Sequence, residues 1–260
     1  MSGIYIHVPF CYQRCHYCDF YSTLRLNDRS SFVDALIREI KYRKDFLGTN
    51  IVDTIYFGGG TPSVLSHNDI ERILEAIKNI FAVSEDAEIT LEANPDDLSK
   101  DYLNSISKTA LNRLSIGIQS FNDDDLKTLN RRHDAKQAIE AVRNAKDSGF
   151  SNMSIDLIYG LPKQTEEKWK ENLETALDLE VDHISAYHLT YEKGTLFHRW
   201  LKKGQLEELK DEQSLSLFNM LVETMEEYAY EQYEILNFAR KGQYSRHNTK
   251  YWFGRQYLGL

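Results

Sequence analysis

Short apolar segments of strand length alternate with amphipathic segments of helix length along almost the whole chain, and this alternation limits the possible folds most. The expected strands are Ile4–Val8, Thr54–Phe57, Glu88–Leu91, Arg113–Ile118, Met153–Ile158, His183–His188 and a last one at Tyr233–Phe238. The expected helices are Ser31–Phe46, Asn68–Ile80, 122–129, 135–148, Glu166–Leu179 and 212–229. Strands that alternate with helices form a parallel sheet, because each helix carries the chain back to the end where the strands begin.

The number of repeats and the residues at the strand ends favour one parallel architecture. About six strand–helix repeats, without a dinucleotide-binding glycine fingerprint after the first strand, predict a partial (β/α) barrel rather than a doubly wound sheet. Polar or special residues follow several strands, and in such barrels the carboxyl ends of the strands form the active-site face. These residues are a cysteine-rich loop, the run Gly58–Pro62, Glu92, Gln119 and the neighbourhood of Asp156 near the end of its strand.

The last residues predict how the chain is divided. The segment 257–260 is apolar and resembles the start of a strand, so we expect a C-terminal domain to be truncated there. We therefore assign residues 1–230 to the barrel and residues 231–260 to the start of a C-terminal region.

Composition excludes several classes of protein. With 42% hydrophobic and 27% charged residues the chain is a folded protein, not a disordered one. Its 31 basic and 40 acidic residues give a net charge of −9, which argues against nucleic acid as the main partner. No apolar run approaches the roughly 20 residues of a membrane span, and the first residues lack a basic signal-peptide region. We expect a cytoplasmic protein.

All three cysteines of the chain, Cys11, Cys15 and Cys18, lie within eight positions. An odd number so close together suits a metal or cluster site better than disulfides. A cubane iron–sulfur cluster normally takes four cysteines, so three would leave one iron open to a small chelating molecule. The alternative is a zinc site completed by His16 or His7, although the second C-x-x-C pair that zinc sites usually have is missing.

The glycine run strengthens the cluster interpretation. Gly58-Gly59-Gly60-Thr61-Pro62 follows the second strand, where glycines let backbone N–H groups approach a ligand closely. Without the cysteine loop before it, such a run could equally be a tight turn between a strand and a helix. The order of a cysteine loop and then a glycine run resembles the radical S-adenosylmethionine superfamily.

Further motifs narrow this resemblance to the oxygen-independent coproporphyrinogen III oxidases and their relatives. They occur in the order of that family across nearly the whole chain. The motifs are Tyr5–Cys11 (YIHVPFC), 92–95 (EANP), Gly117–Phe121 (GIQSF), Asn130-Arg131 and Asp156–Pro162 (DLIYGLP).

The resemblance implies a role for each matching residue. Cys11, Cys15 and Cys18 match the ligands of a 4Fe–4S cluster. In this superfamily the open iron binds S-adenosylmethionine, and reduction yields a 5′-deoxyadenosyl radical. The remaining matches concern S-adenosylmethionine itself, and some lie on a second molecule of it in the oxidases; they are Tyr5, Gly59, Gly60, Thr61, Glu92, Gln119, Arg131 and Asp156. Without the resemblance, Arg131 would be interpreted as a surface charge.

One residue and one short segment distinguish the two branches of the family. The oxidases have a fourth cysteine where this chain has Phe20, and the segment from His247 to Trp252 resembles the H-N-x-x-Y-W signature of the haem-chaperone branch, HemW. This implies a protein that binds and delivers haem, with His247 as the axial ligand, although a lone histidine beside Tyr251 and Trp252 is often only a packed residue.

The branch also implies partners. We expect haem or another porphyrin as cargo, a haem-accepting protein, and a reductant for the cluster. The alternative is an enzyme of porphyrin biosynthesis, an oxygen-independent coproporphyrinogen III oxidase that converts two propionates to vinyl groups.

Overall fold

The computed structural model describes all 260 residues and contains one nine-stranded sheet in the order β7-β8-β6-β5-β4-β3-β2-β1-β9. Six strands pair in chain order and all are parallel; they are β1 (Ser2–Val8), β2 (Val52–Gly59), β3 (Val83–Ala93), β4 (Arg113–Gln119), β5 (Asn152–Tyr159) and β6 (His183–His188). The predicted partial (β/α) barrel of about six parallel strands is therefore confirmed.

Short strands extend both edges of this barrel sheet. β7 (Tyr230–Glu234) and β8 (Asn237–Arg240) form a hairpin whose second strand runs antiparallel to β6. At the other edge, β9 (Tyr257–Gly259) pairs in parallel with β1. Residues beyond 230 thus join the same sheet as the barrel, and the division at residue 230 stays a prediction.

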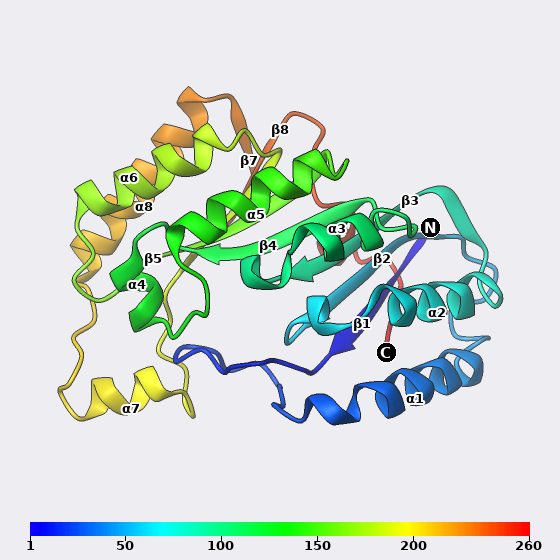
Figure 1. Cartoon of the computed structure of the whole chain (residues 1–260). Helices are drawn as coiled ribbons and strands as arrows, with labels where there is room; N and C mark the ends of the chain where they lie inside the picture. The colour runs from blue at the N-terminus through cyan, green and yellow to red at the C-terminus, as the bar shows by residue number, and fades with distance from the viewer.

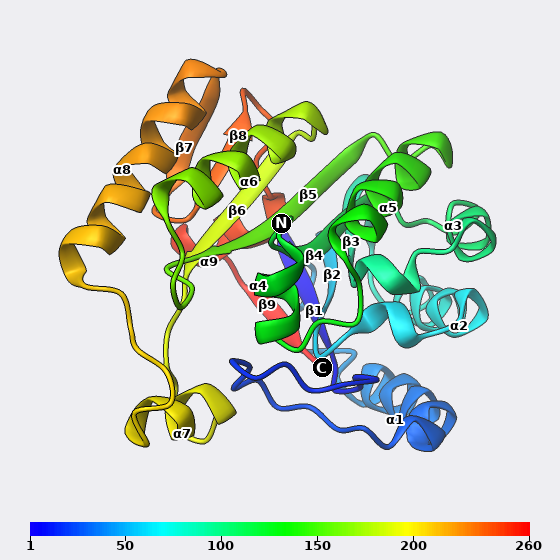
Figure 2. The same ribbon diagram turned by 60° about the vertical axis from the view of Figure 1, so that its left-hand side comes forward.

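Helices cover the outer face of the curved sheet, as Figures 1 and 2 show for α1, α2, α5, α6 and α8. The helices are α1 (Arg29–Tyr42), α2 (His67–Lys78), α3 (Lys100–Ile106), α4 (Asp123–Thr128), α5 (Ala135–Asp147), α6 (Glu166–Asp178), α7 (Leu196–Lys202), α8 (Asp211–Glu227) and α9 (Arg246–Trp252). Local sequence sets where several of them begin. Ser66 and Asp69 form a capping box at α2, and Asp134 and Gln137 form one at α5, so that orphan N–H groups at both helix starts are satisfied. No helix is both long and apolar enough to cross a membrane.

The two faces of the barrel strands differ in chemistry. Every second side chain, such as Ile4 and Ile6 of β1 or Ile55 and Phe57 of β2, enters one apolar core of 53 buried residues. Residues that alternate with these face the inside of the curve, and many are polar or aromatic. They are Tyr5, His7, Thr54, Tyr56, Glu88, Thr90, Glu92, Arg113, Ser115, Ser154, Asp156, His183, Ser185 and Tyr187. Burial of the outer set stabilises the fold, and the inner set is available for chemistry.

Near the end of the chain the structure contradicts one expectation and confirms another. The single strand expected at Tyr233–Phe238 is wrong, because the chain reverses at 235–236 and forms the β7–β8 hairpin. The strand-like character of residues 257–260 is confirmed by β9. Between β8 and β9 the chain crosses the inner side of the sheet as α9, whose His247 and Lys250 bond to Thr54 and Asp53 of β2.

Candidate functional site

The cysteine loop follows β1 directly and is held in place by the turn between α4 and α5. The Gln13 amide donates to the Asn130 carbonyl at 2.9 Å, and the Asn130 amide donates to the Arg14 carbonyl at 2.8 Å. Asn130 has φ of +60°, a left-handed conformation that asparagine tolerates better than most residues. From the other side, the Phe197 N–H of α7 donates to the His16 carbonyl at 3.0 Å. The loop therefore has a defined shape over the carboxyl ends of the strands.

The thiols of this loop meet hydrogen-bond donors that suit thiolates. Thr61 donates to Cys11 Sγ at 3.3 Å, and Arg131 donates to Cys15 Sγ at 3.5 Å. Burial raises the pKa of Cys11 and Cys18, and the Thr61 hydroxyl opposes this for Cys11. Because metals bind the thiolate, ligation would release these protons. No three His, Cys, Asp or Glu side chains lie close enough to hold a single metal ion.

The glycine run approaches neighbouring groups so closely that side chains are excluded. Gly59 has φ of +108°, and a Cβ there would lie 2.6 Å from the His7 ring. A Cβ on Gly60 would lie 2.8 Å from the Phe10 carbonyl oxygen. These glycines keep the backbone open beside Cys11 and Thr61, as expected of a strand end that binds a ligand through its backbone.

Glu92 lies at the end of β3 beside this run. It accepts hydrogen bonds from the Tyr56 hydroxyl at 2.8 Å and from the Gly59 N–H at 3.2 Å. Burial raises the pKa of Glu92 to about 7, and repulsion from Asp156 adds to this, while the two hydrogen bonds oppose it. A carboxylate in this setting gains from a cationic ligand group such as an ammonium.

Arg131 lies inside the site and is not a surface charge. Its guanidinium donates to Asn94 Oδ1 at 2.6 Å and to the Gly117 carbonyl at 2.5 Å, besides Cys15. Gln119 lies close by, because a Cβ on Gly117 would be 2.9 Å from its Nε2. The register of β4 and β5 shifts between Gly117 and Gln119, and Gln119 has φ of +74°, so a bulge directs this side chain.

Asp156 of β5 completes the predicted set on the inner face. It pairs with Gly117 in the sheet register and lines a cavity of about 40 Å³ together with Glu92 and Tyr56. Burial raises the pKa of Asp156 to about 6, although Ser185, Arg113 and Arg131 lower it.

His247 lies deeper, under the aromatic side chains of this site. It is 1% exposed, and its ring stacks on Tyr56 at 5.1 Å between centroids. Its Nδ1 bonds to Thr54 Oγ1 at 2.9 Å and its Nε2 to the Tyr251 hydroxyl at 3.0 Å. Burial lowers the pKa of His247 to about 4. The imidazole is therefore neutral above pH 4, and both ring nitrogens are engaged.

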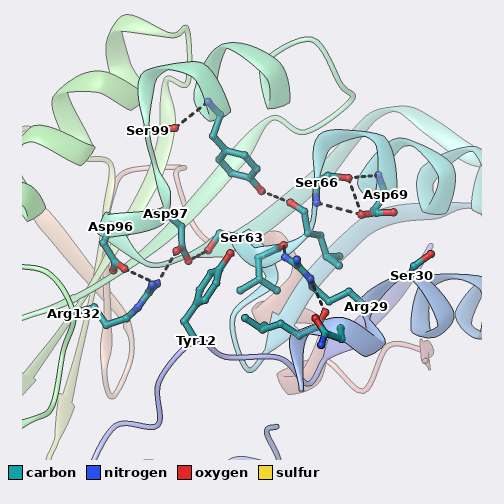
Figure 3. A pocket seen from close by; sticks show the side chains of 15 residues that line it. Tyr12, Arg29, Ser30, Ser63, Ser66, Asp69, Asp96, Asp97, Ser99 and Arg132 are labelled. Atoms are coloured by element: carbon teal, nitrogen blue, oxygen red, sulfur yellow. Dashed lines mark hydrogen bonds and ion pairs between the residues drawn. The ribbon is translucent and has the colours of Figure 1, made fainter. Parts of the chain in front are cut away.

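A larger cleft, of about 760 Å³, lies outside the barrel interior (Figure 3). Its wall includes Tyr12 of the cysteine loop and the starts of α1 and α2. Arg132 spans part of this cleft and pairs with Asp96 at 2.5 Å and Asp97 at 2.6 Å. None of the residues predicted to bind a cofactor lines it, so its size alone does not make it the site.

Sequence reasoning missed several residues that the fold brings to this site. Tyr56 of β2 and Arg113 at the start of β4 belong to no motif, and Asn94 lies in the EANP motif, in which only Glu92 was given a role. The available signal was the alternation of polar and apolar residues in the strands, for example Thr54, Tyr56 and Gly58 between apolar neighbours. This alternation marks a polar inner face once the strands are placed in a barrel.

Comparison with known proteins gives a consistent result. The model of the radical SAM superfamily matches residues 5–176. The heme chaperone HemW of Bacillus subtilis is 38% identical over this whole chain, which spans 69% of that protein. The mitochondrial radical S-adenosyl methionine domain-containing protein 1 of Danio rerio is 34% identical, and the chain spans 59% of it.

The structural comparison points to the same group of proteins. The coproporphyrinogen III oxidase HemN of Escherichia coli superimposes with a TM-score of 0.85 at 27% identity, and this chain spans 62% of it. The match to HemW is higher in identity and covers the segment from His247 to Trp252. The chain belongs to the radical SAM superfamily and, within it, to the family of the heme chaperone HemW.

Proposed function

We propose that the protein holds a 4Fe–4S cluster through Cys11, Cys15 and Cys18 and binds S-adenosylmethionine at the remaining iron. The observation that supports this most is the set of groups around the thiols. Thr61 and Arg131 donate to two of them, and the Gly59 backbone and Glu92 lie beside the same loop. Soft thiolates suit iron–sulfur clusters, so the donor set fits this cofactor.

The chain supplies complementary charges for the parts of S-adenosylmethionine. Glu92 matches its ammonium group and Arg131 its carboxylate, since guanidinium groups bind carboxylates well. Asp156 and Gln119 match the ribose hydroxyls, and Tyr5 contributes an aromatic wall through its stacking on Tyr56. A 4Fe–4S cluster held by Cys11, Cys15 and Cys18 would supply the one-electron reductive chemistry for which S-adenosylmethionine is bound.

Haem is the proposed cargo. A name shared by several relatives, heme chaperone HemW, supports haem binding and delivery over the oxidase activity of HemN. The acceptor is then a haem-requiring protein, and a separate reductant serves the cluster. A cytoplasmic location and a C-terminal region from residue 231 stay part of this proposal.

We retain His247 as the proposed axial ligand, with a condition that the structure sets. Its Nε2 is hydrogen-bonded to the Tyr251 hydroxyl, so iron can reach this nitrogen only after that hydroxyl moves away. Tyr251 is 44% exposed, and Trp252 beside it is also exposed, so both can contact an apolar disc that approaches from solvent.

The cluster is tested by anaerobic reconstitution. We expect about four iron and four sulfide per chain, because three thiolates can anchor a cubane. Replacement of Cys11, Cys15 or Cys18 by Ala should abolish the brown colour. S-adenosylmethionine should change the electron paramagnetic resonance spectrum of the reduced cluster. Stoichiometric zinc without acid-labile sulfide, or an unchanged spectrum, would contradict the proposal.

Haem binding is tested by variants with opposite expected effects. His247→Ala should weaken binding and remove the Soret shift, and Tyr251→Phe should strengthen binding, because it removes the hydroxyl that competes for Nε2. The iron content of both variants should match that of the wild type. A parallel assay of coproporphyrinogen turnover decides between the branches. Turnover that is unaffected by His247→Ala would support the oxidase instead.

A further inference from the structure

Arg113 is a buried cation without a partner. It lies at the start of β4, faces the inside of the barrel and is 2% exposed. Its side chain forms no ion pair and no hydrogen bond with the rest of the chain, and its Nε is fully enclosed. A buried charge without compensation destabilises the folded state, because it has lost its hydration, and an apolar residue of similar size does not have this effect. The interior of the barrel must therefore compensate this guanidinium in another way.

A cavity beside Arg113 provides the means. It has a volume of about 40 Å³, which is room for a few ordered water molecules. Nearly all of its wall is polar, and two of the wall residues are the carboxylic acids Glu92 and Asp156. The full set is Tyr56, Glu92, Arg113, Ser115, Ser154, Asp156, His183, Ser185, Tyr187 and Asn248. Water in this space can connect the guanidinium to both acids, because water carries hydrogen bonds between groups too far apart for direct contact.

The two acids need a cation at this position. Glu92 and Asp156 repel each other, and burial disfavours their charged forms. Arg113 lowers the pKa of both acids, and Arg131 lowers that of Asp156 from the side of the cysteine loop. The other titratable groups near the pair are phenols, which are uncharged at neutral pH and whose pKa is raised further, and a histidine whose pKa burial lowers. They are Tyr5 of β1, Tyr56 of β2, His183 and Tyr187 of β6, and Tyr251 of α9.

We propose that Arg113 is a positioning residue of the S-adenosylmethionine site, which acts through water in the cavity to keep Glu92 and Asp156 ionised and directed toward the ligand. This inference rests on the proposed function, because it assigns both acids to that ligand. Arg113 itself does not touch the ligand in this scheme. Its effect is a matter of charge, so another cation at the same position can replace it in part.

The test compares Arg113→Met, which removes the charge, with Arg113→Lys, which keeps it. Equilibrium binding of S-adenosylmethionine to the reconstituted protein is measured from pH 6 to pH 9. In the wild type the affinity should fall as the acids gain protons below pH 7. In Arg113→Met we expect affinity at pH 7 to be about tenfold lower and the midpoint of the pH profile about one unit higher, since one pKa unit corresponds to a factor of ten. Arg113→Lys should keep the wild-type midpoint.

A matched control separates charge from packing. Ile116→Val, on the outer face of the same strand, removes one buried methylene group and should leave the midpoint unchanged. A second measurement does not need the ligand. Infrared spectra of the apo-protein at pH 7 should show more protonated carboxyl groups in Arg113→Met than in the wild type, and Glu92→Gln in the same background should remove part of that signal.

The outcomes distinguish this inference from the proposed function. An unchanged midpoint in Arg113→Met, together with unchanged infrared spectra, would overturn the role of Arg113 even if S-adenosylmethionine binds. If the wild type binds no S-adenosylmethionine, the proposed function and the ligand-directed role of Arg113 both fail, and the infrared result then shows only whether Arg113 sets the charge of the two acids.

Discussion

Gly59 shows how a missing side chain shapes the site at the scale of one residue. Its positive φ would strain any other residue, and the space where a Cβ would stand is filled by the ring of His7. The same backbone presents an N–H to Glu92, so position 59 links the glycine run to the ionisable group of the site.

Gly59→Ala should therefore lower stability and S-adenosylmethionine binding together. We expect the free energy of unfolding to fall by about 1–3 kcal/mol from backbone strain, with a further loss from the contact with His7. Gly149→Ala is the matched control, because Gly149 has φ of +94° but no atom within 4 Å of the added Cβ. Chemical denaturation measures the loss of stability in both variants, and equilibrium binding measures the loss of affinity for S-adenosylmethionine. Equal losses in the two variants would show that the contact with His7 is unimportant.

At this scale the sequence predicts residues that carry local motifs. The cysteines, the glycine run and Glu92 all lie where strands end, so their position in the chain already indicates their place in a barrel. Arg113 and Tyr56 lie within strands, and their importance depends on which face of the sheet they occupy. That face is decided by packing of the whole barrel, because a shift of one residue would turn both outward.

At the scale of a single element, the short helix α9 is held against the sheet by buried polar contacts. Its seven residues lie against the start of β2 and the middle of β3, where the His247 N–H donates to Glu88 at 3.0 Å. The Lys250 ammonium pairs with Asp53 at 2.6 Å in a nearly buried position. The sequence predicted no helix here, since seven residues are too few for a clear apolar period and the polar residues of α9 point inward.

Lys250→Met should destabilise the protein strongly, because it leaves the Asp53 carboxylate buried without its close partner. Arg246, 3.6 Å from the other carboxylate oxygen of Asp53, still compensates part of this charge, so we expect a loss below the roughly 3–5 kcal/mol of a buried charge left with no partner. Asp53→Leu combined with Lys250→Met should recover most of this loss, since neither charge then remains buried. Denaturation of both single variants and the double variant completes the cycle. If the double variant is as unstable as Lys250→Met, the cost comes from packing and not from charge.

At the scale of the whole molecule, the barrel predicted from strand–helix alternation is the correct architecture. The short helices α3 and α7 were not predicted, and the last part of the chain also differs. The hairpin of β7 and β8 reads as one strand in the sequence because its turn at Ile235 and Leu236 is apolar. Apolar residues do not signal a turn, and tertiary packing sets this reversal. The alternating polar inner face also makes the stability of the molecule depend on pH.

Two opposing effects on stability are expected for the apo-protein. Burial raises the pKa of Glu92 to about 7 and that of Asp156 to about 6, so the folded state binds these protons more tightly than the unfolded state. Their contribution is present below about pH 4 and is lost as pH rises through 6 to 7. Burial lowers the pKa of His247 to about 4, so its contribution is present above pH 6.5 and is lost as pH falls toward 4.

Variants should separate the two effects. Glu92→Gln should gain stability relative to the wild type between pH 5 and pH 8, by about 1–3 kcal/mol, because the glutamine needs no proton. His247→Asn should flatten the loss of stability between pH 6.5 and pH 4. Guanidinium denaturation at a series of pH values measures both. Profiles parallel to the wild type would contradict the assigned groups.

The pairing of β9 with β1 has a consequence for synthesis on the ribosome. β1 is the first strand to emerge, yet one of its edges receives its neighbour only when residues 257–259 are available. During elongation the backbone of Gly3 and Tyr5 on that edge is therefore open to pairing with other chains. Among the nine strands of the sheet, the first one made therefore gains its second neighbour from the last one made, and a chaperone that shields nascent strands would act on this edge until residue 259 has emerged.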